Sequence, residues 1–95
     1  MYAAYVYFLS NKFNGTLYVG STTDLRKRIW EHKNQLREGF ASKYGLDKLV
    51  YYEEHQNIIA AGEQEKRYKN WRREWKIALI KERNPFWHDL YCEVV

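Results

Sequence analysis

The N-terminal part of the chain has two short apolar stretches on either side of a turn sequence, and this arrangement limits the possible folds more than any other feature. Tyr2 to Leu9 reads YAAYVYFL, with apolar side chains at odd and even positions, which is typical of a strand buried on both faces. Asn11 to Gly15 reads NKFNG and ends in Asn-Gly, a pair favoured in tight hairpin turns. Thr16 to Ser21, TLYVGS, predicts a second strand, so we expect an antiparallel hairpin.

Capping side chains follow the hairpin directly. Residues 21–24 read STTD and offer hydroxyl and carboxylate oxygens to the free amides at the start of a helix. We expect this helix to end near Gly39, with an apolar face formed by Leu25, Ile29 and Leu36.

A third strand and a second helical region complete the pattern. Lys48 to His55, KLVYYEEH, predicts a strand that follows a turn at Gly45 and Asp47. Helical spacing then starts near residue 57, and its expected apolar face consists of Ile58, Ala61, Tyr68, Trp71 and Trp75. We expect a kink or a new helix at residues 71–73, and an end before Pro85, because proline disfavours the helical conformation of the preceding residue. We expect the C-terminal residues 86–95 to fold back onto the core.

The predicted order β-β-α-β-α-(α) defines an α+β fold, with a small three-stranded antiparallel sheet flanked by helices. A length of 95 residues fits one domain over 1–95, and an aromatic content of 18% supplies large apolar groups for its core. The single Cys92 excludes an intramolecular disulfide, and no segment has the pattern of a signal peptide or membrane span. These features favour a cytoplasmic setting, and the net charge of +4 is compatible with a polyanionic partner.

Several polar residues occupy positions where packing alone would not place them. Tyr7 and Tyr18 lie on the two hairpin strands, close to opposite one another and within cross-strand reach. Gly20 follows on the face of Tyr18, and a strand glycine often marks a close approach to the backbone. On the next helix, Arg28 and His32 are one turn apart and share a face.

Glu65 interrupts the apolar face of the second helical region, where a carboxylate is costly unless it is paired or holds a cation. Phosphodiester hydrolysis needs a base, positive charge for the transition state and a metal ion. Arg28 offers a forked donor for phosphate oxygens, and Glu65 a hard ligand for Mg²⁺ or Mn²⁺. Glu63 is the alternative ligand, and Gly62 predicts a helix that begins late or is locally loose.

Each of these residues also has an ordinary structural explanation. The two tyrosines fit core positions with satisfied hydroxyls. Arg28 fits an i,i+4 pair with Asp24, and Glu65 fits one with Lys69. The joint occurrence of all the polar positions favours a functional site.

A basic stretch, residues 66–76, reads KRYKNWRREWK and interleaves aromatic and cationic side chains. Such a composition suits phosphate contacts and base stacking, although an amphipathic helix with a solvated basic face explains it equally well. No recognition helix or zinc finger is evident in the sequence. The candidate nucleic-acid-binding residues are Lys27, Lys66, Arg67, Lys69, Arg72 and Arg73, with Arg37 and Lys43 extending the patch.

Three motifs carry a family resemblance: Y-V-Y at 5–7, Y-V-G at 18–20 and D-L-R-K-R-I-x-E-H at 24–32. Together they resemble the GIY-YIG nuclease module of homing endonucleases, restriction enzymes and the N-terminal domain of the bacterial excision-repair nuclease. The resemblance covers nearly the whole chain. The later stretches YGLDKLVYYEE and EKRYKNWRREWK look like those of small stand-alone bacterial members of the family.

The resemblance implies a divalent-metal-dependent endonuclease. It implies that Tyr7 and Tyr18 are the signature tyrosines, one of them the general base, with Tyr18 slightly favoured. It implies a catalytic role for Arg28, contact with the active site for His32 and metal binding for Glu65. Gly20 corresponds to the glycine of the second motif.

Two departures accompany the resemblance: Tyr5 replaces the first motif's glycine, and Ser21 stands where the excision-repair domain has a lysine. The implied partner is nucleic acid, with DNA favoured and a role in DNA repair. Stand-alone modules usually lack a domain for target specificity, so a protein partner is a further expectation. The alternatives are a non-catalytic nucleic-acid-binding module with the same fold and, more weakly, an interaction domain that uses exposed aromatics.

Overall fold

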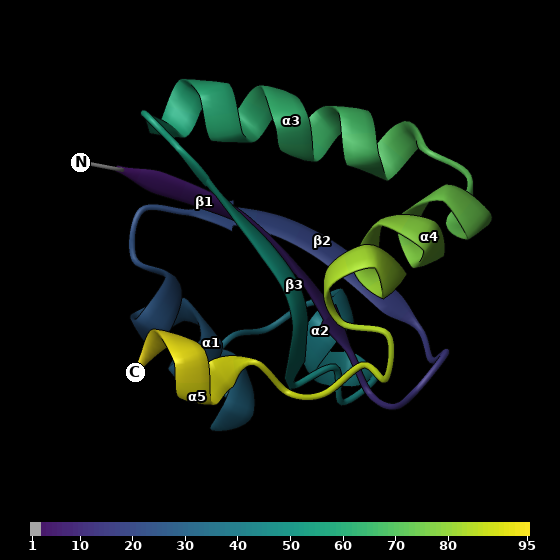
Figure 1. The fold of residues 1–95 in the computed structure, drawn as a ribbon. Coiled ribbons are helices and arrows are strands. Elements are labelled where there is room, and N and C mark those ends of the chain that lie inside the picture. Colours follow the sequence, from purple (N-terminus) through teal and green to yellow (C-terminus); the bar gives the residue numbers. More distant parts are fainter. Residues whose placement is uncertain (1–2) are drawn as a thin grey trace.

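The computed structural model of the chain describes residues 3–95, and over these residues it contains three strands and five helices (Figure 1). In chain order they are β1 (Ala4–Ser10), β2 (Leu17–Thr22), α1 (Leu25–Lys33), α2 (Phe40–Lys43), β3 (Lys48–His55), α3 (Ile58–Asn70), α4 (Arg73–Arg83) and α5 (Tyr91–Val94). This order confirms the predicted α+β fold. Tyr2, where the first strand was expected to begin, lies outside the described residues.

The three strands form one antiparallel sheet in the order β2-β1-β3, so β1 is central and the other two are edge strands. Val6 and Phe8 point to one face, and Tyr7 and Leu9 point to the other; all four are fully buried. The central position of β1 therefore explains why its sequence is apolar at both odd and even positions.

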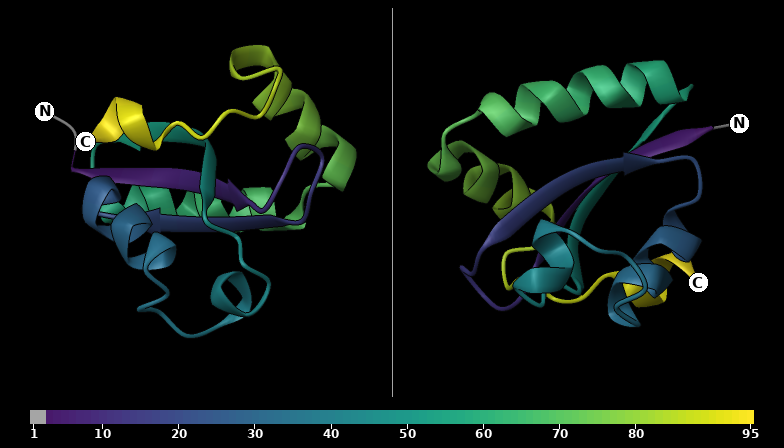
Figure 2. Two further views of the ribbon diagram at one scale, coloured as in Figure 1. Left: turned by 90° about the horizontal axis from the view of Figure 1, so that it is seen from below. Right: turned by 180° about the vertical axis from the view of Figure 1, so that it is seen from behind.

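Helices cover both faces of the sheet (Figures 1 and 2). α3 crosses one face and contacts all three strands, and α4 continues this layer against β3. α1, α2 and α5 lie on the other face. Within residues 3–95, no helix combines the length and the apolar character that a membrane crossing requires.

α1 is shorter than its sequence pattern predicts, because it ends at Lys33 and not near Gly39. Gln35 adopts a left-handed conformation, with φ of 54°, which ends the helix. Leu25 and Ile29 are buried as expected, but Leu36 lies beyond the helix and is 62% exposed. The expected three-residue apolar face is therefore wrong at Leu36.

α3 begins at Ile58 and continues without interruption through Gly62. The Asn57 side chain accepts a hydrogen bond from the Ala60 amide at 2.8 Å, which caps the helix at the expected position. The expectation of a late or loose start at Gly62 is therefore wrong. Ala61 is buried as predicted, but Ile58 is exposed, because it lies in the first turn.

The predicted break at residues 71–73 is confirmed. Trp71 has extended backbone angles, and α4 begins two residues later. Tyr68 is buried and Trp71 packs against the core, but Trp75 is half exposed, since α4 starts in a new direction. α4 ends before Asn84, as the following proline predicts.

The C-terminal residues fold back onto the core, as expected. Trp87 is buried, and the Leu90 amide donates to the Leu49 carbonyl of β3 at 2.7 Å. The buried Asn84 donates its side-chain amide to the carbonyls of Val50 and His88, at 3.0 and 2.8 Å. These bonds tie the end of α4 to the edge strand β3.

Candidate active site

The strand register sets the relation between the two signature tyrosines. Tyr7 pairs directly with Gly20, and Tyr18 pairs with Leu9. Tyr7 and Tyr18 are therefore diagonal neighbours and not direct opposites, because direct pairing needs a turn centred between residues 12 and 13, and the observed turn is centred between residues 13 and 14. Their ring centroids are 6.3 Å apart, within the expected cross-strand reach.

Gly20 provides the space that Tyr7 occupies. A Cβ atom at position 20 would lie 2.5 Å from Tyr7 Oη and 2.6 Å from Tyr7 Cζ. Cβ atoms essentially never make nonbonded contacts this short, so a larger residue would displace the phenol ring. The glycine is needed here for room and not for an unusual backbone conformation.

The hydroxyl of Tyr7 joins Arg28 and His32. Arg28 Nη1 donates to Tyr7 Oη at 3.4 Å and to the Ser21 carbonyl at 3.3 Å. His32 Nε2 lies 3.4 Å from the same hydroxyl. Because arginine is a donor only, the Tyr7 hydroxyl accepts from Arg28, and it pairs with the His32 ring nitrogen as well. The helical spacing of Arg28 and His32 thus brings both to one phenol.

Burial sets the protonation states of this group. It raises the pKa of Tyr7 to about 12, against the opposing effect of the hydrogen bond from Arg28. It lowers the pKa of His32 to about 4, and the positive charges of Arg37 and Arg28 act in the same direction. At neutral pH both Tyr7 and His32 are therefore uncharged. His32 Nδ1 is buried without a hydrogen-bond partner among the described residues.

Tyr18 lies beside His32, and Lys69 of α3 lies over its ring. The ring centroids of Tyr18 and His32 are 6.0 Å apart, and Lys69 Nζ is 5.8 Å from the centroid of Tyr18. The same ammonium lies 2.6 Å from Glu65 Oε2. Tyr18 is partly exposed, unlike Tyr7, and is therefore accessible from solvent.

Ser21 connects the two sides of the site. Its hydroxyl donates to Glu65 Oε1 on α3, and its carbonyl accepts from Arg28 on α1. Tyr7 and Tyr18 lie on the α1 face of the sheet, and Glu65 reaches Ser21 from the α3 face. The site therefore spans the edge strand β2, which runs between α3 and α1 (Figure 2).

The structure brings together all the residues that the resemblance singles out, and adds Ser21. Sequence reasoning noted Ser21 only as a departure from the family pattern. The signal that could have identified it is strand alternation, because the residue after Gly20 must point to the opposite face, toward the helix that carries Glu65. Arg28 does not pair with Asp24; the Asp24 side chain accepts from the Lys27 amide and caps α1.

The residues present fit a hydrated divalent cation at Glu65. Mg²⁺ typically uses one or two carboxylates and keeps several waters, and Glu65 is partly exposed beside the Ser21 hydroxyl. No group of three or more His, Cys, Asp or Glu side chains able to enclose a metal occurs within residues 3–95. Glu63 is exposed, and two residues of helix turn it about 200° away from Glu65, so it does not face β2.

The candidate basic residues have three different surroundings. Lys69 faces the site through Glu65 and Tyr18. Arg73 holds the hairpin turn, because it donates to the carbonyls of Asn14 and Gly15 at 2.8 and 2.7 Å. The remaining candidates are exposed on α1, on α3 and at the start of α4: Lys27, Lys66, Arg67 and Arg72.

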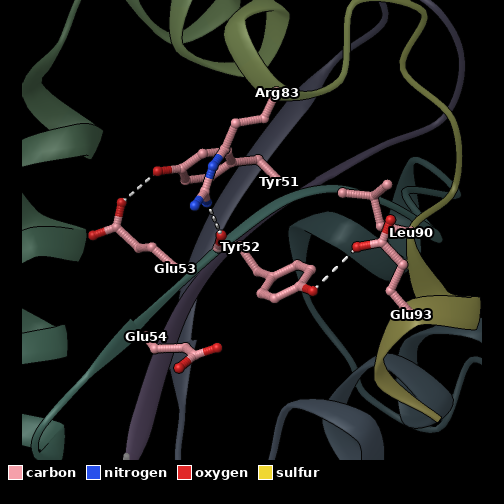
Figure 3. A pocket seen from close by; sticks show the side chains of 7 residues that line it. All are labelled: Tyr51, Tyr52, Glu53, Glu54, Arg83, Leu90 and Glu93. Carbon is pink, nitrogen blue, oxygen red and sulfur yellow. Dashed lines mark hydrogen bonds between the residues drawn. The ribbon is translucent and has the colours of Figure 1, made fainter.

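A separate surface pocket lies along the opposite edge strand β3 (Figure 3). It has a volume of about 590 Å³ and is lined by Tyr51, Tyr52, Glu53, Glu54, Arg83, Leu90 and Glu93. Arg83 donates to the Tyr52 carbonyl at 3.0 Å, and the Tyr52 hydroxyl donates to Glu93 at 3.2 Å. Three carboxylates would repel a phosphate. The chemistry of a phosphodiester therefore fits the β2 edge and not this pocket.

Comparison with known proteins agrees with the geometry. Residues 3–78 match the model of the GIY-YIG catalytic domain. A UPF0213 protein of Streptococcus sanguinis is 38% identical over 84 residues, which covers 84% of this chain and 91% of the relative. A UPF0213 protein of Clostridium perfringens is 36% identical over 80 residues, which covers 84% and 85%. No solved structure matches the chain significantly. The chain therefore belongs to the GIY-YIG family.

Proposed function

We propose that the protein is a divalent-metal-dependent endonuclease that hydrolyses phosphodiester bonds in nucleic acid, with DNA as the favoured substrate. The observation that carries this proposal is the chain of contacts from Glu65 through Ser21 and Arg28 to Tyr7. It sets a carboxylate, a guanidinium and a phenol around one edge strand. These groups can supply the metal ligand, the positive charge and the base that phosphodiester hydrolysis needs.

Arg28 stabilises negative charge on the phosphate in this proposal. Its Nη1 is held by Tyr7 and the Ser21 carbonyl, so the guanidinium has a fixed direction before substrate binds. Glu31 approaches Arg28 Nε at 3.7 Å and helps to hold it. Preorganised donors of this kind lower the barrier because they need no reorientation during the reaction.

Tyr18, in its deprotonated phenolate form, is the proposed base that accepts the proton of the attacking water. Tyr7 is less suited, because burial raises its pKa to about 12 and its hydroxyl already contacts both Arg28 and His32. Tyr18 is partly exposed and lies beside the neutral His32 ring. His32 orients the two phenols through its hydrogen bond with Tyr7 and its ring contact with Tyr18.

Glu65 is the proposed ligand for Mg²⁺ or Mn²⁺, with Ser21 orienting its carboxylate. A bound cation supplies positive charge for the phosphate and leaving group. Lys69 now pairs with the same carboxylate. When a divalent cation binds Glu65 Oε2, the Lys69 ammonium is free to contact the substrate phosphate from the α3 side.

The exposed basic side chains of α1, α3 and α4 support phosphate contacts along the substrate. The free and exposed Cys92 fits a reducing cytoplasmic setting. We also propose a role in DNA repair, because the three sequence motifs resemble those of the excision-repair domain. A protein partner that supplies target specificity is also part of it.

The test is cleavage of labelled single-stranded, duplex and branched DNA and of RNA by the purified protein. Each substrate is incubated with Mg²⁺, with Mn²⁺ and with EDTA. The proposal expects products with either metal and none with EDTA. Products that persist in EDTA would overturn the metal requirement.

A second candidate is a nucleic-acid-binding module without catalysis. The ion pair between Lys69 and Glu65 favours it, because the expected metal ligand is already occupied by an internal cation. This candidate predicts salt-sensitive binding to nucleic acid and no products with any metal.

A further inference from the structure

Two aromatic side chains in contact with each other, Phe40 and Tyr44, are exposed at α2, on the same face of the sheet as Tyr7 and Arg28, with their ring planes tilted by 49°. The ring centroids of Phe40 and Tyr44 are 4.7 Å apart, and the side chains are 49% and 50% exposed. Lys43 Nζ lies 5.6 Å from the ring centroid of Tyr44. Two adjacent aromatic faces in water, beside an ammonium, form an apolar and cationic surface that no part of the described chain covers.

The backbone holds this pair in a defined position. Gly39 and Gly45 flank the pair with φ of 124° and 65°, conformations that L side chains rarely adopt. Ala41 and Leu46 are buried in the cluster that also contains Tyr7, and the Leu46 amide donates to the Ala41 carbonyl at 2.8 Å. The exposed rings are therefore presented by a turn that is anchored in the same core as the candidate site.

Arg37 links this turn to the candidate site. Its Nη1 lies 3.5 Å from Glu31 Oε1, on the helix that carries Arg28 and His32. Residues 37–48 contain three basic and two acidic side chains, a small positive excess. A ligand that meets this surface therefore meets aromatic faces and cations together.

Nucleic-acid bases are ligands that match both properties, because each base has a flat π-face and is attached to a phosphate. In a duplex the faces are covered by neighbouring bases, so an exposed aromatic pair can stack only with an unpaired base. The β2 edge, where the phosphate chemistry is proposed, lies next to α2 (Figure 2). One nucleic-acid strand can therefore contact the aromatic pair at α2 and the β2 edge at the same time.

We propose that Phe40, Tyr44 and Lys43 form a stacking subsite for an unpaired base, beside the phosphate held at the β2 edge. This inference rests on the proposed nuclease function and narrows its substrate to nucleic acid with a single-stranded segment near the cut. Phe40 and Tyr44 supply the stacking faces. Lys43 contacts the phosphate of the stacked nucleotide.

The test measures binding by fluorescence anisotropy in EDTA, so that no cleavage occurs. The probes are a fluorescein-labelled oligothymidylate, an abasic oligonucleotide of the same length and a blunt hairpin duplex. The variants are Phe40→Ala and Tyr44→Ala, with Tyr44→Phe as the conservative variant. Phe86→Ala is the matched control, because Phe86 is 70% exposed and follows α4, far from α2 in the chain. Circular dichroism checks that each variant is folded.

The subsite predicts that each alanine variant binds oligothymidylate about fivefold or more weakly, while Tyr44→Phe and Phe86→Ala bind it like the wild type. Binding of the abasic oligonucleotide should be unchanged in all variants. Unchanged binding of oligothymidylate by both alanine variants would overturn the subsite, and so would equal weakening with the abasic probe. A wild-type protein that binds none of the probes would overturn the proposed function as well.

Discussion

Tyr7 lies directly across the hairpin from Gly20, and its hydroxyl occupies the space where a Cβ atom at position 20 would stand. The same hydroxyl meets Arg28 and His32, each at 3.4 Å. A single residue without a side chain thus sets the position of the phenol and, through it, of two polar groups from α1. A steric requirement therefore explains the glycine of the second motif, and a substitution at position 20 tests it.

Gly20→Ala should destabilise the fold and abolish cleavage, because the new methyl group displaces the Tyr7 ring. Overpacking of this kind costs about 1–3 kcal/mol, which urea denaturation measures. Gly62→Ala is the control. A Cβ there meets nothing within 4 Å, and alanine should stabilise α3 by up to about 1 kcal/mol. If Gly20→Ala cleaved at the wild-type rate, cleavage would not depend on the position of the Tyr7 ring.

Arg28→Lys should reduce cleavage by about 100-fold or more while the protein stays folded. Lysine keeps the positive charge but loses the planar fork that reaches Tyr7, the Ser21 carbonyl and a phosphate together. Arg26→Lys, on the exposed side of the same helix, provides the matched control and should cleave normally. Single-turnover cleavage assays distinguish the two variants, and equal rates would refute the assignment.

Tyr18→Phe should reduce cleavage by about 100-fold or more with little effect on stability, because it removes the proposed base and keeps the ring. Tyr7→Phe should behave differently. It leaves Arg28 and His32 without their shared partner and should cost about 1 kcal/mol of stability. Measured rates and unfolding curves for both variants decide which phenol is the base. Normal cleavage by Tyr18→Phe would exclude it.

His32 should make the stability of the protein depend on pH in the acidic range. Burial lowers its pKa to about 4 in the folded state from the ordinary 6.5, so the unfolded chain binds more protons between these values. Its contribution is fully present above about pH 6.5 and decreases as the pH falls toward about 4. From pH 7 to pH 5 the free energy of unfolding should fall by about 2 kcal/mol from this residue.

Urea denaturation of His32→Asn at the two pH values checks this prediction, because the variant should lose that part of the pH dependence. His88→Asn is the control, since His88 is exposed and its loss should leave the pH dependence intact. An identical pH dependence in wild type and His32→Asn would show that His32 is not held neutral by burial.

The strands and the order of elements can be predicted from sequence because they depend on local patterns. The hairpin follows from Asn14-Gly15 between two apolar stretches, and the break before α4 from the change of pattern near Trp71. The early end of α1 cannot be predicted in this way. It depends on the left-handed conformation of Gln35, a residue type that gives no such signal.

The residues of the candidate site could be selected from the sequence, but the contacts between them could not. The contact between Ser21 and Glu65 joins positions 44 residues apart, and it depends on how α3 crosses β2. No local periodicity contains that information. The diagonal relation of Tyr7 and Tyr18 depends on the register of the hairpin, which a shift of one residue in the turn changes.

The most direct test of the account compares Glu65→Gln with Glu63→Gln in a cleavage assay with Mg²⁺ and in a titration of Mn²⁺ binding. Both changes remove one carboxylate from α3 and preserve its shape, but only Glu65 faces Ser21 and the β2 edge. If Glu65 is the metal ligand, Glu65→Gln loses both metal binding and cleavage, while Glu63→Gln keeps both. Metal-dependent cleavage by Glu65→Gln at the wild-type rate would contradict it.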